Sequence, residues 1–125
     1  MLITARVHPG ETPSSYALEG IVNFLLNRND ARAALLRHFF VFLIVPMLNP
    51  DGVYHGHYRM DVFNNNLNRF YKIADPIRQP SIFGIRNLVE NLHKDRRLFF
   101  YIDLHAHAGK KGHFMYGNAF EDLIM

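Results

Sequence analysis

Three largely apolar runs stand out along the chain and predict its strands. They cover residues 1–7 (MLITARV), 39–46 (FFVFLIVP) and 98–104 (LFFYIDL). Each run has the length of a strand and is rich in β-branched or aromatic residues, which is typical of strands that are buried on both faces. We therefore expect three buried strands, the first of them at the start of the chain.

The segments between these runs carry apolar residues at helical spacing. Thr12 followed by Pro13 marks a helix start, because proline suits the first helical position, and this helix continues to about Asn27. Residues 31–37 predict a short second helix, and residues 79–81 begin a third that ends within residues 94–97. The apolar faces of the two longer helices are expected to contain Tyr16 or Ala17 with Ile21, Phe24 and Leu25, and Ile85 with Leu88, Val89 and Leu92.

The rest of the chain is predicted to form loops and turns. Residues 47–78 combine Asn-Pro-Asp-Gly, several further asparagines and little periodicity, which is the composition of a long ordered loop. Gly109 and Gly112 bracket two lysines as a turn, and residues 113–117 (HFMYG) are predicted to begin a fourth short strand.

Strands that alternate with helices predict an α/β fold with a mostly parallel mixed sheet flanked by helices. In such sheets, ligands bind beyond the carboxyl ends of the strands. His8 and Glu11 follow the first predicted strand, Asn49 and Asp51 follow the second, and His105 ends the third. Three separate segments are therefore expected to bring ligand-type side chains to the same edge of the sheet.

Composition narrows the possible chemistry. The 125 residues suit one domain, and 14 Lys and Arg against 11 Asp and Glu give a formal charge of +3, spread along the chain, which does not indicate nucleic-acid binding. The absence of cysteine means that a metal would be held by His, Asp or Glu. Because no apolar run reaches roughly 18 residues and no secretory signal pattern opens the chain, we expect a cytoplasmic protein without membrane segments.

His8, Glu11 and His105 match the two-histidine, one-glutamate set that holds catalytic zinc. Pro9, Gly10 and Pro13 would rigidify the bend that carries the first two ligands. An ordinary turn histidine packed on Pro9 is the alternative for His8. His107 competes with His105, because residues two apart in an extended chain point the same way, and Asp103 could orient an imidazole.

Longer blocks of sequence carry a family resemblance. RVHPGETPSS, PMLNPDGVYHGHYRMD, NNLNRFY and YIDLHAHAGKKGHFMYGN resemble the zinc metallocarboxypeptidases, and specifically the cytosolic carboxypeptidase subfamily that trims glutamates from tubulin. The resemblance extends from Ile3 to Asn118. It implies one Zn²⁺ ion, removal of C-terminal or branch-point glutamates from polyglutamylated protein tails such as those of tubulin, and a cytoplasmic, microtubule-associated location.

The same resemblance implies roles for individual residues. His8, Glu11 and His105 match the zinc ligands. Arg59 matches the arginine that steadies the oxyanion of the tetrahedral intermediate, and Asn68 and Arg69 match the pair that grips the terminal carboxylate of the substrate.

The sequence departs from the family pattern in two ways. Asn64 stands where the family usually has glycine, and asparagine is the side chain that best tolerates positive φ after glycine. The glutamate that serves the family as general base lies well downstream of the third zinc ligand, and Glu121 and Asp122 come too early to match it. We therefore expect residues 1–125 to be a partial zinc carboxypeptidase catalytic domain, with the family's N-terminal accessory domain also missing.

Two other functions remain open at this point. An aspartoacylase-like zinc amidohydrolase would share the His-x-x-Glu pair, an Asn-Arg pair and a later histidine, although the HPGETPSS and DLHAHAGKKGHFMYGN blocks argue against it. Alternatively, the chain is a truncated, non-catalytic fragment that binds zinc or acidic tails and hydrolyses nothing.

Overall fold

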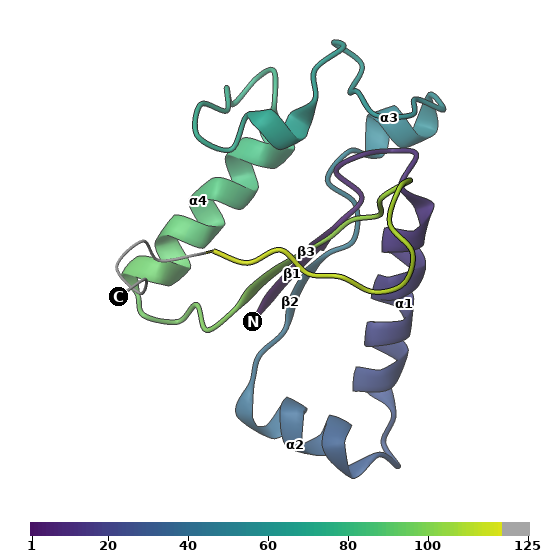
Figure 1. Cartoon of the computed structure of the whole chain (residues 1–125). Helices are drawn as coiled ribbons and strands as arrows, with labels where there is room; N and C mark the ends of the chain where they lie inside the picture. The colour runs from purple at the N-terminus through teal and green to yellow at the C-terminus, as the bar shows by residue number, and fades with distance from the viewer. Residues whose placement is uncertain (119–125) are drawn as a thin grey trace, which may run out of the picture.

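The computed structural model describes residues 1–118, in which three short strands form a parallel sheet with the order β2-β1-β3. The strands are β1 (Leu2–Ala5), β2 (Leu43–Val45) and β3 (Tyr101–Leu104), as Figure 1 shows. The α/β fold with a parallel sheet is therefore confirmed. Glu121 and Asp122, which were compared with the family's general base, lie outside the described residues.

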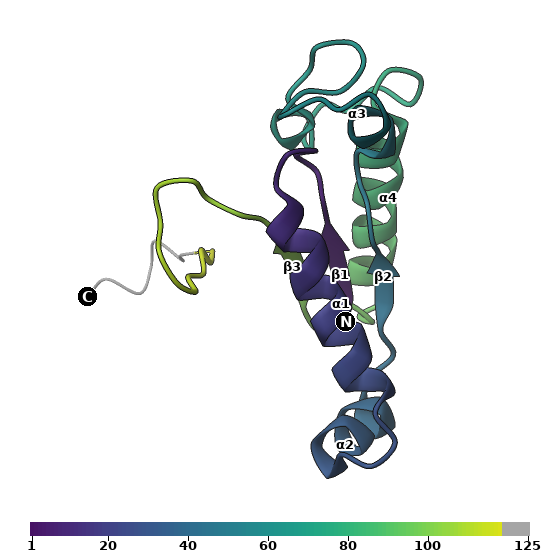
Figure 2. The same ribbon diagram turned by 90° about the vertical axis from the view of Figure 1, so that its right-hand side faces the viewer.

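Helices cover both faces of this sheet. They are α1 (Thr12–Leu26), α2 (Ala31–Phe39), α3 (Pro50–Tyr54) and α4 (Pro80–Lys94), with a 3₁₀ turn, η1 (Leu67–Arg69). Figures 1 and 2 show α1 on one face of the sheet and α4 on the other. The predicted helix starts at Thr12 and Pro80 are confirmed, each with proline in the first turn. The short elements α3 and η1 lie within the segment predicted as one long loop.

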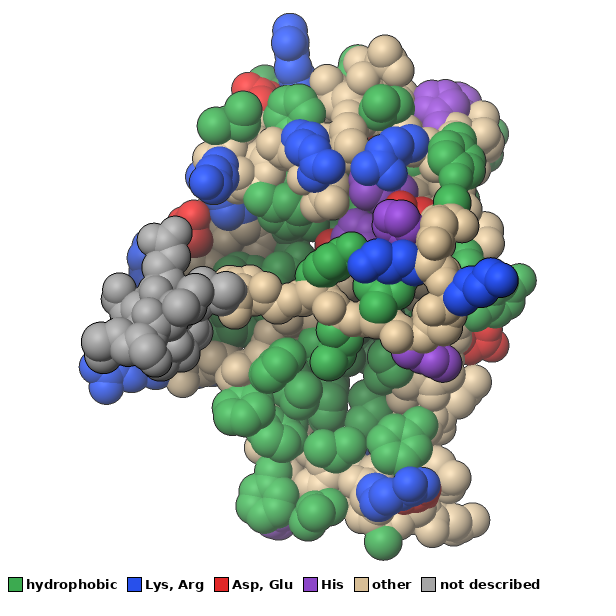
Figure 3. All heavy atoms as spheres, in the orientation of Figure 1, with side chains coloured by type: hydrophobic (Ala, Val, Ile, Leu, Met, Phe, Trp, Pro, Cys, Tyr) green, Lys and Arg blue, Asp and Glu red, His purple; other side chains and the backbone are tan. Residues whose placement is uncertain are grey.

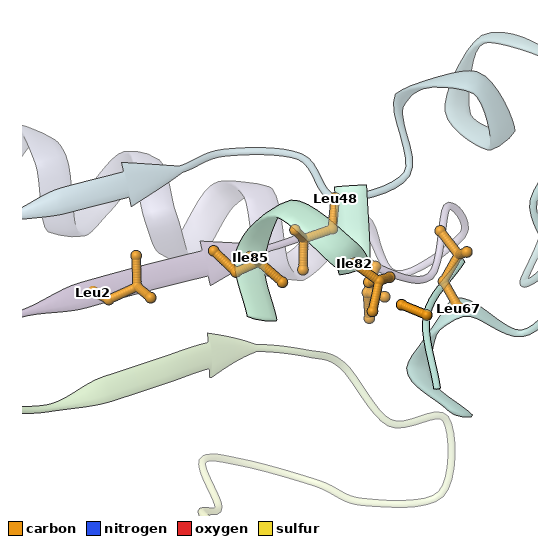
Figure 4. Close-up of a cluster of buried hydrophobic side chains, with 7 residues drawn as sticks. Leu2, Leu48, Leu67, Ile82 and Ile85 are labelled. Carbon is orange, nitrogen blue, oxygen red and sulfur yellow. The ribbon is translucent and has the colours of Figure 1, made fainter. Parts of the chain in front are cut away.

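The core lies on both sides of β1, whose residues are all buried. Because successive side chains of a strand point to opposite faces, Leu2 packs with Ile82, Ile85 and their neighbours below α4, while Ile3 and Ala5 pack with Leu18 of α1. Figure 4 shows Leu2, Ile82 and Ile85 in the cluster on the α4 side. The central strand thus joins two separate apolar layers.

The other two strands are less buried than predicted. Within the run 39–46, Val41 is 74% exposed and Leu43 is 37% exposed, and Phe99 and Phe100 are exposed just before β3. The expectation of strands buried on both faces is therefore wrong for these two runs. The physical reason is their position, because β2 and β3 are the outer strands of the described sheet and each has a neighbour on one side only.

Two further predictions need correction. The buried face of α1 contains Ser14, Leu18 and Leu25, whereas Tyr16 and Ala17 point to solvent. Residues 113–117 form no strand. A strand needs a partner for its backbone groups, and an apolar pattern alone does not provide one. In residues 1–118, no helix has the length and apolar character needed to span a bilayer.

Candidate metal centre

His8, Glu11 and His105 meet beyond the carboxyl ends of β1 and β3. The Glu11 carboxylate lies between the two imidazoles, with Oε1 2.7 Å from His8 Nδ1 and Oε2 3.1 Å from His105 Nδ1. The three candidate ligand atoms all lie within 4.8 Å of one another. Parallel pairing of Ala5 with Leu104 brings the two strand ends together, so segments nearly a hundred residues apart in sequence become neighbours.

The far nitrogen of each imidazole is held by an oxygen. His8 Nε2 lies 3.0 Å from Asn66 Oδ1, and the same oxygen accepts a hydrogen bond from the backbone N–H of Asn68. His105 Nε2 lies 2.7 Å from Asp103 Oδ2. Because both oxygens are acceptors, both Nε2 atoms carry the proton, and the two Nδ1 atoms are left facing Glu11. This arrangement matches the way in which metal-bound histidines are usually oriented.

The electrostatics of this cluster fit a cation. Two Nδ1 atoms and a carboxylate that face one another present lone pairs to a shared point, and a proton or a metal ion is needed to hold them together. The hydrogen bond to Asp103 raises the pKa of His105, and the nearby Glu11 carboxylate adds to the effect, while partial burial opposes it. Two imidazoles and one carboxylate are a donor set that suits zinc.

The bend between β1 and α1 is fixed by local bonds. Arg6 adopts a φ of 59°, which is rare for a residue with a side chain. Its guanidinium donates from Nε to the Pro9 carbonyl and from Nη1 to Ser15 Oγ, both at 2.7 Å. Ser14 Oγ donates to the carbonyl of Glu11 at 2.7 Å. The chain therefore turns sharply enough for His8 and Glu11 to face the same point.

The second bend, around Asn49, supports the site without joining it. The Asn49 side chain is buried, accepts from Gly52 N at the start of α3, and donates to the carbonyls of Val7 and Met60. Asp51 is exposed. Asn49 therefore lies at the expected edge of the sheet, where its amide ties three backbone segments together.

The residues expected to contact substrate differ in how directly they contact the cluster. Arg59 Nη1 lies 3.7 Å from Glu11 Oε1, with the side chain 40% exposed. Asn68 and Arg69 lie on η1, which is capped by Asn66, the partner of His8. The Arg69 side chain is exposed and donates only to the carbonyl of Asn68 in the described part of the chain. Figure 3 shows His and acidic side chains with Lys and Arg side chains around them on this face.

Two finer expectations can be compared with the geometry. Asn64 has a φ of 61°, so the left-handed conformation expected of the residue in the glycine's place is confirmed. His107 is exposed and its Nδ1 accepts from the backbone N–H of Gly109, outside the cluster. Of the two competing histidines, His105 is therefore the one that faces His8 and Glu11.

Sequence analysis missed Asn66 as the partner of His8. Its position two residues before Asn68, within a run of asparagines, was the available signal, but nothing in the sequence indicates which of these amides points toward the bend. Contacts between loops far apart in sequence can be assigned only once the sheet has set the distances.

With this geometry in place, comparison with known proteins decides the family. The sequence profile of the zinc carboxypeptidases matches residues 1–119. The chain belongs to the zinc carboxypeptidase family. Among the relatives of this zinc carboxypeptidase chain, cytosolic carboxypeptidase 6 of Homo sapiens is 47% identical over 124 residues, which cover 98% of this chain and 24% of the human protein. Cytosolic carboxypeptidase 3 of Bos taurus is 45% identical and covers 94% of this chain and 12% of the bovine protein.

Solved structures agree with the assignment. The crystal structure of a putative carboxypeptidase A from Shewanella denitrificans superposes with a TM-score of 0.78 at 34% sequence identity. The match covers 87% of this chain and 28% of the Shewanella chain. This zinc carboxypeptidase chain therefore spans about a quarter of the length of the human relative and of the matched bacterial structure.

Proposed function

We propose that this chain forms the zinc-binding part, and some of the substrate-binding part, of a metallocarboxypeptidase that removes C-terminal or branch-point glutamates from protein tails such as those of tubulin. The observation that carries the proposal is the convergence of His8, Glu11 and His105 within 4.8 Å. The relatives named cytosolic carboxypeptidases support the reaction class and a cytoplasmic location, and we extend the proposal to association with microtubules.

In this proposal His8 and His105 hold zinc through Nδ1, and Glu11 holds it through its carboxylate. When bound, zinc polarises the scissile carbonyl and the attacking water. Asn66 and Asp103 keep the imidazoles oriented by accepting their Nε2 protons. Backbone support comes from Ala106 N, which donates to Glu11 Oε2 at 2.8 Å and so helps to hold the carboxylate beside the two imidazoles.

Arg59, Asn68 and Arg69 would bind the substrate. The Arg59 guanidinium lies beside Glu11, where it could stabilise negative charge on the scissile carbonyl oxygen of a bound substrate. Asn68 and Arg69 stand on η1 next to the partner of His8, where an amide and a planar guanidinium can bind both oxygens of a terminal carboxylate. Arg69 is exposed, and apart from the bond from Nη1 to the Asn68 carbonyl its donors have no partner in the described structure.

The isolated chain is proposed to bind zinc and acidic tails without releasing glutamate. Besides Glu11, the described residues include Glu19 and Glu90, which are exposed on α1 and α4. Neither makes a contact with the cluster in residues 1–118, so neither is placed to act as the general base. Glutamate released from a polyglutamylated peptide by the purified 125-residue chain would contradict this part of the proposal.

Zinc content tests the ligand assignment directly. The purified chain should retain one zinc per molecule after dialysis, as measured by mass spectrometry of the metal, and His105→Ala should retain none. His107→Ala is the matched control, because this exposed histidine lies two residues away and outside the cluster, and it should retain the metal. Equal zinc in the chain and in His105→Ala would rule out the assignment.

Substrate class needs a separate assay. A protein that contains this chain within a complete catalytic domain should release glutamate from a glutamylated tail peptide and leave an N-acyl amino acid intact. The carboxypeptidase names of the relatives and of the matched structure favour this outcome. Cleavage of the N-acyl amino acid alone would favour the aspartoacylase-like alternative.

A further inference from the structure

Thr4 is a polar residue at the centre of the core. It lies in the middle of β1 and its exposed fraction is 0%. A fully buried hydroxyl costs free energy unless it is hydrogen-bonded, so its partners show what it does. In the parallel sheet Thr4 is the direct partner of Asp103, the residue whose carboxylate contacts His105.

The Thr4 hydroxyl joins two side chains of β3. Thr4 Oγ1 donates to Asp103 Oδ1 at 2.6 Å, and it lies 3.2 Å from the hydroxyl oxygen of Tyr101. Because the single proton of Thr4 goes to the carboxylate, Tyr101 is the donor in the second bond. Burial raises the pKa of Tyr101, so its hydroxyl keeps the proton that it donates. Asp103 thereby accepts a hydrogen bond from Thr4 on one carboxylate oxygen and one from His105 on the other.

Spacing along β3 makes this chain of contacts continuous. Tyr101 and Asp103 are two residues apart and share one face of the sheet, and His105 follows at the same spacing. The contacts therefore run from the buried core through Tyr101, Thr4 and Asp103 to the imidazole at the end of the strand. A carboxylate with both oxygens engaged has little freedom to rotate.

We infer that Thr4 is a positioning residue, which fixes the Asp103 carboxylate so that it holds His105 with Nδ1 directed at the metal. This inference rests on the zinc site proposed above. Thr4 touches neither the metal nor the substrate, and its effect passes entirely through Asp103. The role needs a hydroxyl at residue 4 and does not need the methyl group.

Zinc affinity of the 125-residue chain tests this role, with a chromophoric chelator as competitor. Thr4→Val keeps the shape and removes the hydroxyl, and should weaken zinc binding by about tenfold, the lower end of the effect usual for residues that orient metal ligands. Thr4→Ser restores the hydroxyl and should bind zinc as the unmodified chain does. The cobalt-substituted protein should show altered d–d absorption bands in Thr4→Val and unaltered bands in Thr4→Ser.

A double-mutant cycle separates positioning from general loss of stability. If Thr4 acts through Asp103, Thr4→Val should have no further effect on zinc affinity in an Asp103→Ala background. An equal loss in both backgrounds, or unchanged affinity and cobalt spectrum in Thr4→Val, would overturn the inference. If the unmodified chain itself binds no zinc, the proposed metal site fails instead, and the two failures are thus distinguishable.

One measurement does not depend on any variant folding. In the unmodified zinc-loaded chain, the Thr4 hydroxyl proton should give a slowly exchanging NMR signal with a nuclear Overhauser contact to the Tyr101 ring. A hydroxyl proton at residue 4 that exchanges rapidly with water would contradict the hydrogen bond on which the inference depends.

Discussion

The bend at residues 6–12 and the loop at residues 55–69 both lie at the candidate metal centre, but the arginines of the two segments are held to different degrees. The bend is held by side chains: Arg6 bonds Pro9 and Ser15, and His8 is buried. In the loop, Arg59 is 40% exposed and Arg69 bonds only its neighbour's carbonyl in the described structure. The difference indicates that the proposed metal ligands are set in place by the chain itself, whereas the arginines proposed to bind substrate are left largely free to meet a ligand.

The largest expected effect is at Glu11, where the two imidazoles, Arg59 and Ala106 all make contact. Glu11→Ala should reduce bound zinc from one ion per chain to none, because two histidines alone are a poor site. Metal analysis after dialysis measures this. Glu19→Ala, an exposed glutamate on α1, is the matched control and should retain zinc. Full zinc retention in Glu11→Ala would show that the bend is not the metal-binding element.

The contact between bend and loop gives the next largest effect. A Cβ atom at Gly10 would lie 2.6 Å from Tyr58 Cδ2 and 2.7 Å from the Tyr58 carbonyl oxygen. Gly10→Ala should therefore destabilise the fold by about 1–3 kcal/mol, as overpacking does, and it should displace the loop next to Arg59. Urea unfolding measures the free energy.

The matched control for Gly10 is Gly20 in α1. No atom lies within 4 Å of a Cβ built at Gly20, so Gly20→Ala should stabilise the helix by about 0.5–1 kcal/mol. Destabilisation of similar size in both variants would mean that the tight contact at Gly10 is not the cause.

Arg6 gives a smaller effect that tests whether the bend is strained. Arg6→Ala loses the bonds to Pro9 and Ser15 and keeps a side chain at positive φ, so it should cost about 2 kcal/mol. Arg6→Gly loses the same bonds and relieves the strain, so its free energy of unfolding should be about 1 kcal/mol higher than that of Arg6→Ala. Thermal or urea unfolding of the two variants provides the comparison. A glycine variant less stable than the alanine variant would show that the left-handed conformation is not strained.

The smallest expected effect on stability is at Arg69. Arg69→Ala should change the unfolding free energy by less than about 0.5 kcal/mol and leave zinc content unaltered, because the side chain is exposed. In a protein with a complete catalytic domain, it should weaken binding of a peptide α-carboxylate by about tenfold to a hundredfold. Arg78→Ala, another exposed arginine, is the control. Unchanged peptide binding in Arg69→Ala would remove the residue from the proposed site.

The sequence was enough to predict the juxtaposition of His8, Glu11 and His105. The apolar run that precedes His8 and the one that ends at His105 could each be identified as a strand from local sequence. The rule that ligands gather beyond the carboxyl ends of parallel strands then placed the two segments together. The helix starts at Thr12 and Pro80 were equally local, since proline at the first position is a short-range signal.

What could not be predicted depends on contacts across the fold. Thr4 looked like one β-branched residue in an apolar run, and its bond to Asp103 follows from a strand register that no local pattern determines. The exposure of Leu43 depends on which strand is outermost, and the missing strand at residues 113–117 depends on whether a partner is available. Burial and pairing are properties of the assembled sheet.

The long sequence distance between Glu11 and His105 has a consequence for how the protein is made. The two residues are 94 positions apart, so a ribosome that adds about 5–20 residues per second synthesises the bend roughly 5 to 20 s before it adds the histidine. During that interval the nascent chain can form the bend, which is bonded locally, but not the three-ligand cluster. Capture of a metal at the proposed site must therefore wait until His105 has been made and β3 has paired with β1.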